Sequence, residues 1–197
     1  MSEKETNQKY QQIIKASQIL FWKHGVKRVS IEEICSLAKV SKMTFYRFFP
    51  NKIELAKHLL EKVAKEGFDS YKNLVTSDIS FTEKISKLIE MKLESIKNVG
   101  QEFILDLYKN PELGLIPFID ELNKESLKLT ILFIQKAQKE GFIRKNLKID
   151  FILYFFNQMA RMITDNQLIE KYETPQALIM EVTEFFFYGI GAHQDKK

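Results

Sequence analysis

Two short helical patterns separated by only a few residues constrain the fold of this chain more than any other sequence feature. Ser30, with Glu33 three residues later, forms a capping box, which predicts a helix that ends near Ala38. Ser41 is a typical cap for a second helix, which ends near Phe48. Helices this short are unstable alone, so both must pack against the rest of the chain. The pair therefore predicts a helix-turn-helix, in which the second helix enters the major groove of DNA.

Helix start and stop signals continue along the whole chain, and no segment shows the alternating pattern of a β-strand. The 197 residues include only 7 Gly and 4 Pro, which favours an ordered, helix-rich protein over a disordered one. We therefore expect an all-α fold of about nine helices. Besides the pair above, the expected helices span about 9–24, 51–73, 80–100, 110–141, 150–165 and 174–189.

The charged residues are distributed unevenly along the chain. Residues 1–67 contain 13 Lys and Arg against 7 Asp and Glu, a net charge of +6, whereas residues 68–197 contain 17 against 19, a net charge of −2. A basic front part favours contact with a polyanion such as DNA, although a solvated charged face has the same composition. We expect a DNA-binding domain over residues 7–67, with its helix-turn-helix at about 30–49, and a second helical domain over 68–197.

The cysteine content and the apolar segments indicate a cytoplasmic protein. Cys35 is the only cysteine, so no internal disulfide can form, which suits a reducing compartment. The first ten residues contain no apolar stretch of the kind that a signal peptide needs. The longest apolar runs, Phe151–Phe156 and Phe185–Ala192, are much shorter than the ~18 residues that span a bilayer. We therefore expect no membrane association.

The second helix of the pair divides into an inner and an outer face. Phe45 and either Phe48 or Phe49 recur at helical spacing, on the face that can pack against Ile34 and Leu37. The residues on the opposite face are basic or amphipathic, which suits a surface that reads DNA. These outward residues are Lys42, Met43, Tyr46 and Arg47.

Each outward position suggests a contact. The first residues of a recognition helix lie deepest in the groove, so Lys42 is expected to reach guanine and Met43 a thymine methyl group. Tyr46 and Arg47 are expected to bind phosphates, and Lys52 lies in a first helical turn, where backbone N–H groups favour an anion. The predicted DNA-binding residues are Ser30, Ser41, Lys42, Met43, Thr44, Tyr46, Arg47 and Lys52.

The segment from Tyr10 to Lys52 resembles the DNA-binding domain of the TetR family of bacterial regulators. The matching features are Gly25 at a helix end, the S-I-E-E-I block, the A-x-V-S turn, and the T-x-Y-R-x-F-x-x-K pattern that ends at Lys52. The resemblance covers the first quarter to third of the chain. Lys39 departs from it, because the family commonly places glycine there; if this position needs a positive φ, lysine costs about 1 kcal/mol. Met43 also departs, so the operator of a relative does not carry over.

The resemblance implies a sequence-specific repressor that binds a palindromic operator as a homodimer. A single helix-turn-helix reads few base pairs, which also calls for two copies. The last two predicted helices are apolar nearly all round, which predicts burial against a partner, although two central core helices would show the same pattern. The predicted dimer-interface residues are Phe151, Tyr154, Phe155, Met162, Met180, Phe186, Phe187 and Tyr188.

The resemblance further implies a pocket for a small molecule in the middle helices. An effector that binds there is expected to be mostly apolar, and to favour a dimer whose recognition helices are wrongly spaced for DNA. The same residues can equally be core, because aromatic and Met stripes at helical spacing are common in cores. The candidate pocket residues are Met91, Phe103, Leu107, Tyr108, Phe118, Phe133, Asn157, Met159 and Arg161.

Other classes of protein fit the sequence less well. His24, His58 and His193 lie far apart, and no nucleophile elbow, phosphate loop or zinc spacing is present, so we expect no catalytic residues and no enzyme activity. Glu54, His58 and Glu61 share a helix face without the paired Glu-x-x-His motif of di-iron bundles, so we expect no metal or cofactor. Two alternatives stay open: a DNA-binding dimer without small-molecule control that positions a protein partner or organises the chromosome, and a helical interaction module without DNA binding.

Overall fold

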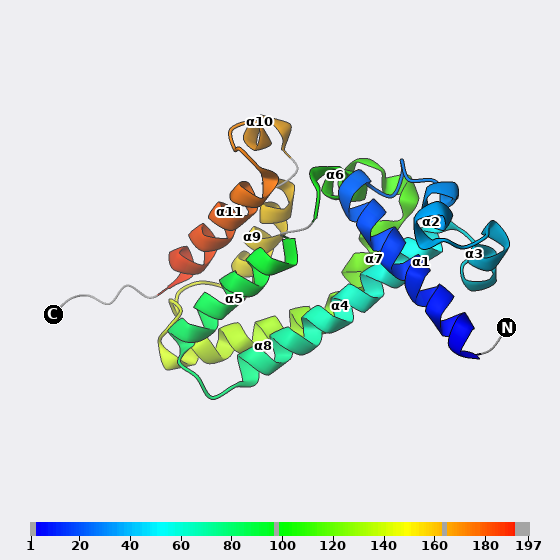
Figure 1. The fold of residues 1–197 in the computed structure, drawn as a ribbon. Coiled ribbons are helices and arrows are strands. Elements are labelled where there is room, and N and C mark those ends of the chain that lie inside the picture. The colour runs from blue at the N-terminus through cyan, green and yellow to red at the C-terminus, as the bar shows by residue number, and fades with distance from the viewer. Residues whose placement is uncertain (1–2, 97–98, 163–164, 192–197) are drawn as a thin grey trace. The chain divides into compact units, whose positions relative to one another are not determined.

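The computed structural model describes residues 3–96, 99–162 and 165–191. All of the secondary-structure elements in these ranges are helices, so the predicted all-α class is confirmed (Figure 1). They are α1 (Glu3–His24), α2 (Ile31–Ala38), α3 (Lys42–Phe48), α4 (Lys52–Thr76), α5 (Phe81–Ile96), α6 (Gln101–Lys109), the 3-10 helix η1 (Pro111–Leu113), α7 (Leu115–Leu122), α8 (Lys124–Glu140), α9 (Ile149–Met162), α10 (Asn166–Ile169) and α11 (Pro175–Ile190).

The helices form two compact units that are not consecutive in the chain. Unit 1 consists of Met1–Glu66 and Asn98–Leu122, and unit 2 of Gly67–Lys97 and Asn123–Lys197. The first break lies one residue before the boundary expected from the sequence, but α6, η1 and α7 join the front unit rather than the rear one. The division of DNA binding and ligand binding between two domains stays a prediction.

The core of unit 1 explains why α2 and α3 form despite their length. Phe21 of α1, Ile34 of α2, Phe45 of α3 and Leu55 of α4 are all completely buried and belong to one cluster. Burying side chains of this size stabilises a fold by about 1.5–3 kcal/mol each. The short helices are therefore held by contacts between helices rather than by their own backbone hydrogen bonds.

The caps and the turn predicted for the helix-turn-helix are present. Ser30 and Glu33 make both hydrogen bonds of a capping box, and the Ser41 hydroxyl accepts from the backbone N–H of Thr44 at 3.1 Å. Lys39, which ends α2, has a φ of 53° and is the one non-glycine residue with positive φ in the described part of the chain. Lysine at this turn therefore carries the left-handed cost of about 1 kcal/mol.

Several expectations about the helices were wrong in detail. The long helix expected up to Gly141 is divided into η1, α7 and α8; Gly114, with a φ of 64°, ends η1, and a second break lies between Leu122 and Lys124. Gly100 does not end a helix; α5 stops at Ile96, and Gly100 caps the start of α6. The helix expected to reach Asp165 ends at Met162 and is followed by the separate α10. The first helix begins at Glu3 instead of residue 9.

Leu37 was wrongly predicted to face the core of the helix-turn-helix. Its side chain is 49% exposed, whereas Ile34, Cys35 and Ala38 on the same helix are buried. Cys35 and Leu37 lie on opposite sides of the stripe formed by Ile34 and Ala38, and the side that carries Cys35 is the one that packs into the core.

Unit 2 has its own core between α8, α9 and α11. Ile134, Ile143, Ile152, Leu178 and Phe186 are all buried in one cluster there. An isolated antiparallel bridge between Ile143 and Gly191 ties the loop after α8 to the end of α11. Within the described ranges, no helix is both long enough and apolar enough to cross a membrane.

Candidate nucleic-acid interface

Helix α3 presents one face to the core and the other to solvent. Phe45 is completely buried and Phe49, directly after the helix, is buried with it. On the opposite face Met43 is 78% exposed and Tyr46 53% exposed, and Arg47 is also exposed. The geometry therefore agrees with the inner and outer faces expected from the spacing.

The predicted contact residues at the start of α3 already hydrogen-bond to one another. The Ser41 and Thr44 hydroxyls lie 2.9 Å apart, and the Ser41 hydroxyl also caps the helix. Ser30 plays the same part for α2, because its hydroxyl and its backbone N–H both donate to the Glu33 carboxylate, at 2.9 and 2.8 Å. These residues hold the backbone of the motif, whatever else they contact.

Lys42 of α3 forms an exposed ion pair with Glu32 of α2. The hydrogen bond from Lys42 holds the pKa of the Glu32 carboxyl below its usual value, and Glu32 in turn raises the pKa of the Lys42 ammonium. An exposed pair of this kind contributes little stability. Lys42 can therefore leave Glu32 for a base edge or a phosphate at little cost.

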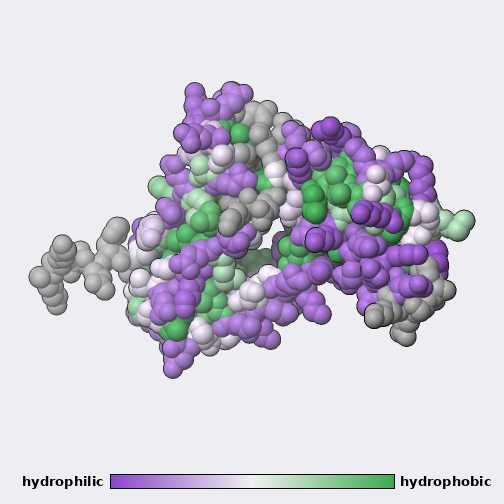
Figure 2. Space-filling model, viewed as in Figure 1, coloured by the Kyte–Doolittle hydropathy of each residue, from purple (hydrophilic) through white to green (hydrophobic). Residues whose placement is uncertain are grey.

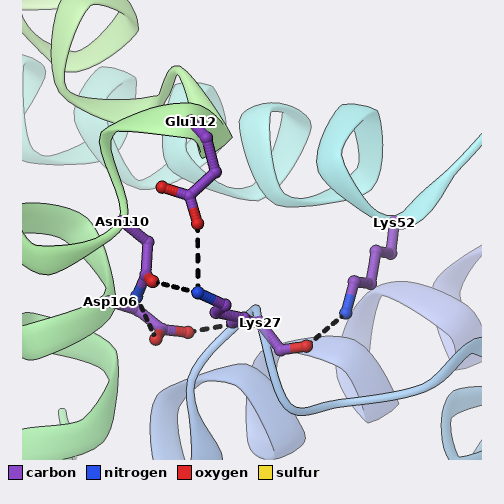
Figure 3. A network of polar contacts seen from close by, with 5 residues as sticks. All are labelled: Lys27, Lys52, Asp106, Asn110 and Glu112. Atoms are coloured by element: carbon purple, nitrogen blue, oxygen red, sulfur yellow. Dashed lines mark hydrogen bonds and ion pairs between the residues drawn. The ribbon is translucent and has the colours of Figure 1, made fainter.

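Lys52 points its ammonium group at the loop between α1 and α2, as Figure 3 shows. The ammonium donates to the backbone carbonyl of Lys27 at 2.6 Å and to that of Val29 at 2.8 Å. Burial lowers the pKa of the Lys52 ammonium. The first-turn position of Lys52 was correct, but two of its three N–H groups bind protein rather than being free for a phosphate.

Lys27 is the centre of a polar network that was not predicted from the sequence (Figure 3). Its backbone N–H donates to the Asp106 carboxylate at 2.7 Å, and its ammonium donates to Asn110 at 2.5 Å and to Glu112 at 3.1 Å. The Asn110 amide donates back to Asp106 at 2.9 Å. The loop that precedes α2 is thus tied to α6 and η1, about 80 residues further along the chain.

Two glycines allow α6 to approach the end of α1 closely. A Cβ atom on Gly25, whose φ is +79°, would lie 2.5 Å from the Asp106 carboxylate. A Cβ atom on Gly100 would lie 2.6 Å from the carbonyl oxygen of Trp22, which accepts a 2.7 Å hydrogen bond from the Gly100 N–H. Gly25 was expected only to end a helix; its second role depends on a neighbour that is distant in sequence.

The candidate pocket residues are divided between the two units. Phe103 and Leu107 pack in the core of unit 1, and the Phe118 ring lies under the Lys57 ammonium at 5.9 Å in the same unit. Phe133 is half-buried and Met159 is buried in unit 2, where Met91 is half-buried too. The side chains of Tyr108, Asn157 and Arg161 lie outside the described residues.

Helices α9 and α11 expose large aromatic side chains, and green hydrophobic residues are visible over α11 in Figure 2. Phe151, Tyr154, Phe185 and Tyr188 are all more than half exposed. Met162 is also exposed, and the predicted interface residues Phe155, Met180 and Phe187 are half-buried.

Phe186 was wrongly placed on this apolar face. It is only 2% exposed, and its ring packs within its own subunit against Phe155 and Phe156, at centroid distances of 6.1 and 4.2 Å. Phe185, its neighbour, is 70% exposed and was missing from the predicted interface set. A shallow hollow of about 230 Å³ lies next to Phe185, between α9 and α11.

Comparison with known proteins identifies a family that the front part matches, and relatives that match up to 77% of the chain. Residues 13–59 match the bacterial regulatory proteins of the tetR family. The HTH-type transcriptional repressor KstR2 of Mycobacterium tuberculosis (strain ATCC 25618 / H37Rv) is 20% identical over 154 residues, which are 77% of each protein. The Transposon Tn10 TetC protein of Escherichia coli is 34% identical over 122 residues, which are 60% of this chain and 57% of TetC.

A solved structure extends the likeness to the fold of nearly the whole chain. The transcriptional regulator FadR from Bacillus subtilis, in complex with stearoyl-CoA, matches with a TM-score of 0.69 at 18% identity. The match covers 92% of this chain and 99% of that one. It shows a shared all-α fold.

Proposed function

This chain belongs to the TetR family of bacterial regulatory proteins, and on that premise we propose that it is a homodimeric, ligand-responsive repressor that binds a palindromic operator. It acts in the cytoplasm and has no catalytic role. The observation that carries the proposal is the two-sided α3. Phe45 anchors the helix in the core, while Lys42, Met43, Tyr46 and Arg47 face solvent.

Dimerisation is supported by the apolar face of α9 and α11. Large exposed aromatic patches are uncommon on monomers and mark interfaces. Phe151, Tyr154, Phe185 and Tyr188 form such a set, and a second copy that covers them removes their apolar surface from water. Two copies carry two recognition helices, which explains why we propose a palindrome with half-sites about one helical turn apart or more.

Ligand response and repression are each supported by one similar protein. FadR from Bacillus subtilis was solved with stearoyl-CoA, and the name of KstR2 describes it as a repressor. We propose that a small molecule likewise favours the form of this protein that releases DNA. A ligand does this only by binding that form more tightly than the DNA-binding form.

The proposal is tested by selecting bound sequences from random duplex DNA. At about 0.15 M salt, purely electrostatic binding is weakened, so enrichment reports on base reading. We expect a palindrome from the unmodified protein. A folded dimer that enriches no sequence contradicts operator recognition.

Lys42→Ala tests the base-reading role within the same selection. We expect it to relax discrimination at one base pair of each half-site by about 1–3 kcal/mol, with the rest of the palindrome unchanged. The matched control is Lys128→Ala, which also breaks an exposed lysine–glutamate pair, with Glu125, but lies in unit 2. If Lys42→Ala weakens specific and random DNA equally, Lys42 binds phosphate and does not read a base.

A further inference from the structure

Unit 2 contains a hollow of about 240 Å³ that no feature of the proposed DNA or dimer surfaces uses. Its lining comes from the loop after α4, the first turns of α5, the end of α8 and Phe142 directly after it. Its size is below that of pockets for drug-sized ligands, so it suits a compact molecule of one or two rings. The lining residues that matter below are Val75, Asp78, Phe81, Lys84, Phe133 and Phe142.

One wall of the hollow is a stack of three phenylalanine rings. Phe81 lies between the other two, with ring centroids 5.7 Å from Phe133 and 4.9 Å from Phe142. The interplanar angles are 17° and 10°, so the rings are nearly parallel. Phe142 is partly exposed, which leaves the stack accessible from solvent. A flat apolar group can lie against such a wall and gain both burial and ring contacts.

The lining also contains a charged residue, Lys84, whose side chain ends in an ammonium group. The residue is only 8% exposed, and its ammonium donates to the backbone carbonyl of Val75 at 2.8 Å. An ammonium has three N–H donors, and Val75 is the one acceptor found for it among the described residues. A buried charge is costly unless it is paired and hydrogen-bonded. Within the described ranges no carboxylate forms an ion pair with Lys84, and a carboxylate bound in the hollow would supply that counter-charge.

The remaining charges of the hollow limit how many negative charges an occupant can carry. Lys136 and Glu140 lie one turn apart on α8 and pair with each other at 3.9 Å. Asp78 adds a further carboxylate to the lining. A single carboxylate can bind Lys84 and keep away from the acids, whereas a second negative charge would meet Asp78 or Glu140.

We propose that this hollow binds a compact aromatic monocarboxylate, with the rings against Phe81, Phe133 and Phe142 and the carboxylate on Lys84. The binding site stands on the geometry alone. Its use as the effector site rests on the proposed function, because only a DNA-binding regulator has DNA to release. A monocarboxylate of this kind satisfies the expectation of a mostly apolar effector and adds one specific polar contact to it.

Calorimetric titration of the full-length protein with 1-naphthoate tests the site. We expect saturable binding with a Kd below about 1 mM. The neutral analogue 1-naphthalenemethanol should bind at least ~10-fold more weakly, because it cannot neutralise Lys84. The dianion 1,8-naphthalenedicarboxylate should also bind more weakly. Absence of saturable 1-naphthoate binding overturns the proposal.

Variants distinguish Lys84 from a general effect of positive charge. Lys84→Met should weaken 1-naphthoate binding at least ~10-fold but leave the neutral alcohol nearly unaffected. The matched control is Lys87→Met, one turn further along α5, where the exposed lysine pairs with Glu83 at 3.0 Å. Equal affinity of the Lys84 variant and the unmodified protein for 1-naphthoate overturns the assignment.

A second variant keeps the test valid if Lys84→Met unfolds the loop after α4. Phe142→Ala removes a partly exposed ring from the stack and should weaken both ligands by a similar factor, about 3–10-fold. Circular dichroism checks that each variant is folded. Unchanged binding to the Phe142 variant contradicts the aromatic wall.

The effector role is measured separately, on the selected operator. If 1-naphthoate weakens operator binding by the unmodified protein but not by Lys84→Met, the hollow is the effector site. If 1-naphthoate binds and operator affinity does not change, the site stands and its effector role is wrong. If the protein binds no operator at all, the proposed function fails while the calorimetric result keeps its meaning.

Discussion

The helix-turn-helix of unit 1 and the α9–α11 face of unit 2 differ in how far their aromatic side chains are exposed to solvent. In unit 1, Phe21, Phe45 and Phe49 are buried within the single chain. On α9 and α11, Phe151 and Phe185 extend into solvent. Both regions are rich in phenylalanine, so composition does not distinguish them. The difference shows that the first region buries its aromatic side chains within one chain, whereas the second leaves apolar surface exposed, which the proposed homodimer would remove from water.

The largest expected effect is the loss of stability when Phe45, the buried anchor of α3, is truncated. We expect Phe45→Ala to lower the free energy of unfolding by about 3–5 kcal/mol, because it leaves a cavity in a cluster that is otherwise fully packed. Urea denaturation at fixed protein concentration measures this loss. The control Met43→Ala, on the exposed side of the same helix, should change stability by less than about 0.5 kcal/mol. Equal losses for both would refute the two-sided α3.

A charge on the exposed face of α11 should break the dimer and leave the subunit folded. We expect Phe185→Glu to weaken dimerisation by about 2–4 kcal/mol, the range of an interface hot spot. Sedimentation velocity over a range of concentrations measures the dissociation constant. The control Leu132→Glu changes an equally exposed apolar side chain on α8 and should leave the dimer intact. A dimer unaffected by Phe185→Glu would move the interface elsewhere.

The two units also differ at their left-handed glycines. In unit 1 such a glycine lies where α6 approaches the loop after α1, whereas in unit 2 the space beside the corresponding glycine is open. Gly25 and Gly141 have φ values of +79° and +84°, but a Cβ atom would meet Asp106 only at Gly25. We expect Gly141→Ala to cost about 1–2 kcal/mol for the left-handed backbone alone. Gly25→Ala should cost at least about 1 kcal/mol more. Similar urea midpoints for the two variants would show that the loop moves away freely.

The smallest expected effect distinguishes two cationic side chains of unit 1, Lys52, which binds the protein backbone, and Arg47, which is exposed. Lys52 donates to two loop carbonyls, so we expect Lys52→Met to weaken operator binding about 10-fold by loosening the loop before α2. The slope of log affinity against log salt should stay the same. Arg47→Ala, which removes an exposed predicted phosphate contact, should reduce that slope by about 0.9. If Lys52→Met also reduces the slope of log affinity against log salt, Lys52 contacts a phosphate.

Local signals of the sequence predicted the bounds of α2, α3 and α11 closely. The Ser30–Glu33 capping box, the Ser41 cap and the Thr174 cap of α11 are all present. Each uses hydrogen bonds between residues no more than four apart, so no distant part of the chain has to be known. The cost at Lys39 was expected from the family resemblance, on the condition that the turn needs a positive φ, and the φ of 53° meets that condition.

Features that depend on residues distant in sequence could not be predicted from local signals. Sequence spacing puts Phe185, Phe186 and Phe187 in one apolar run, yet only Phe186 is buried, because it meets Phe155 and Phe156 of α9. Likewise the ammonium of Lys52 is directed by the carbonyl groups of a loop more than twenty residues earlier. A helix that is apolar all round does not reveal which side its neighbours will cover.

The sequence by itself therefore determined the helical class, the helix-turn-helix and the outward side of α3, since these follow from periodicity and from caps within a few residues. The tertiary structure alone decided which aromatics became core, which side chains hold the loop before α2, and that Lys84 lines the same hollow as three stacked phenylalanines. The physical reason is range. Backbone caps are satisfied by sequence neighbours, whereas burial and the partner of a charge are set by segments that only folding brings together.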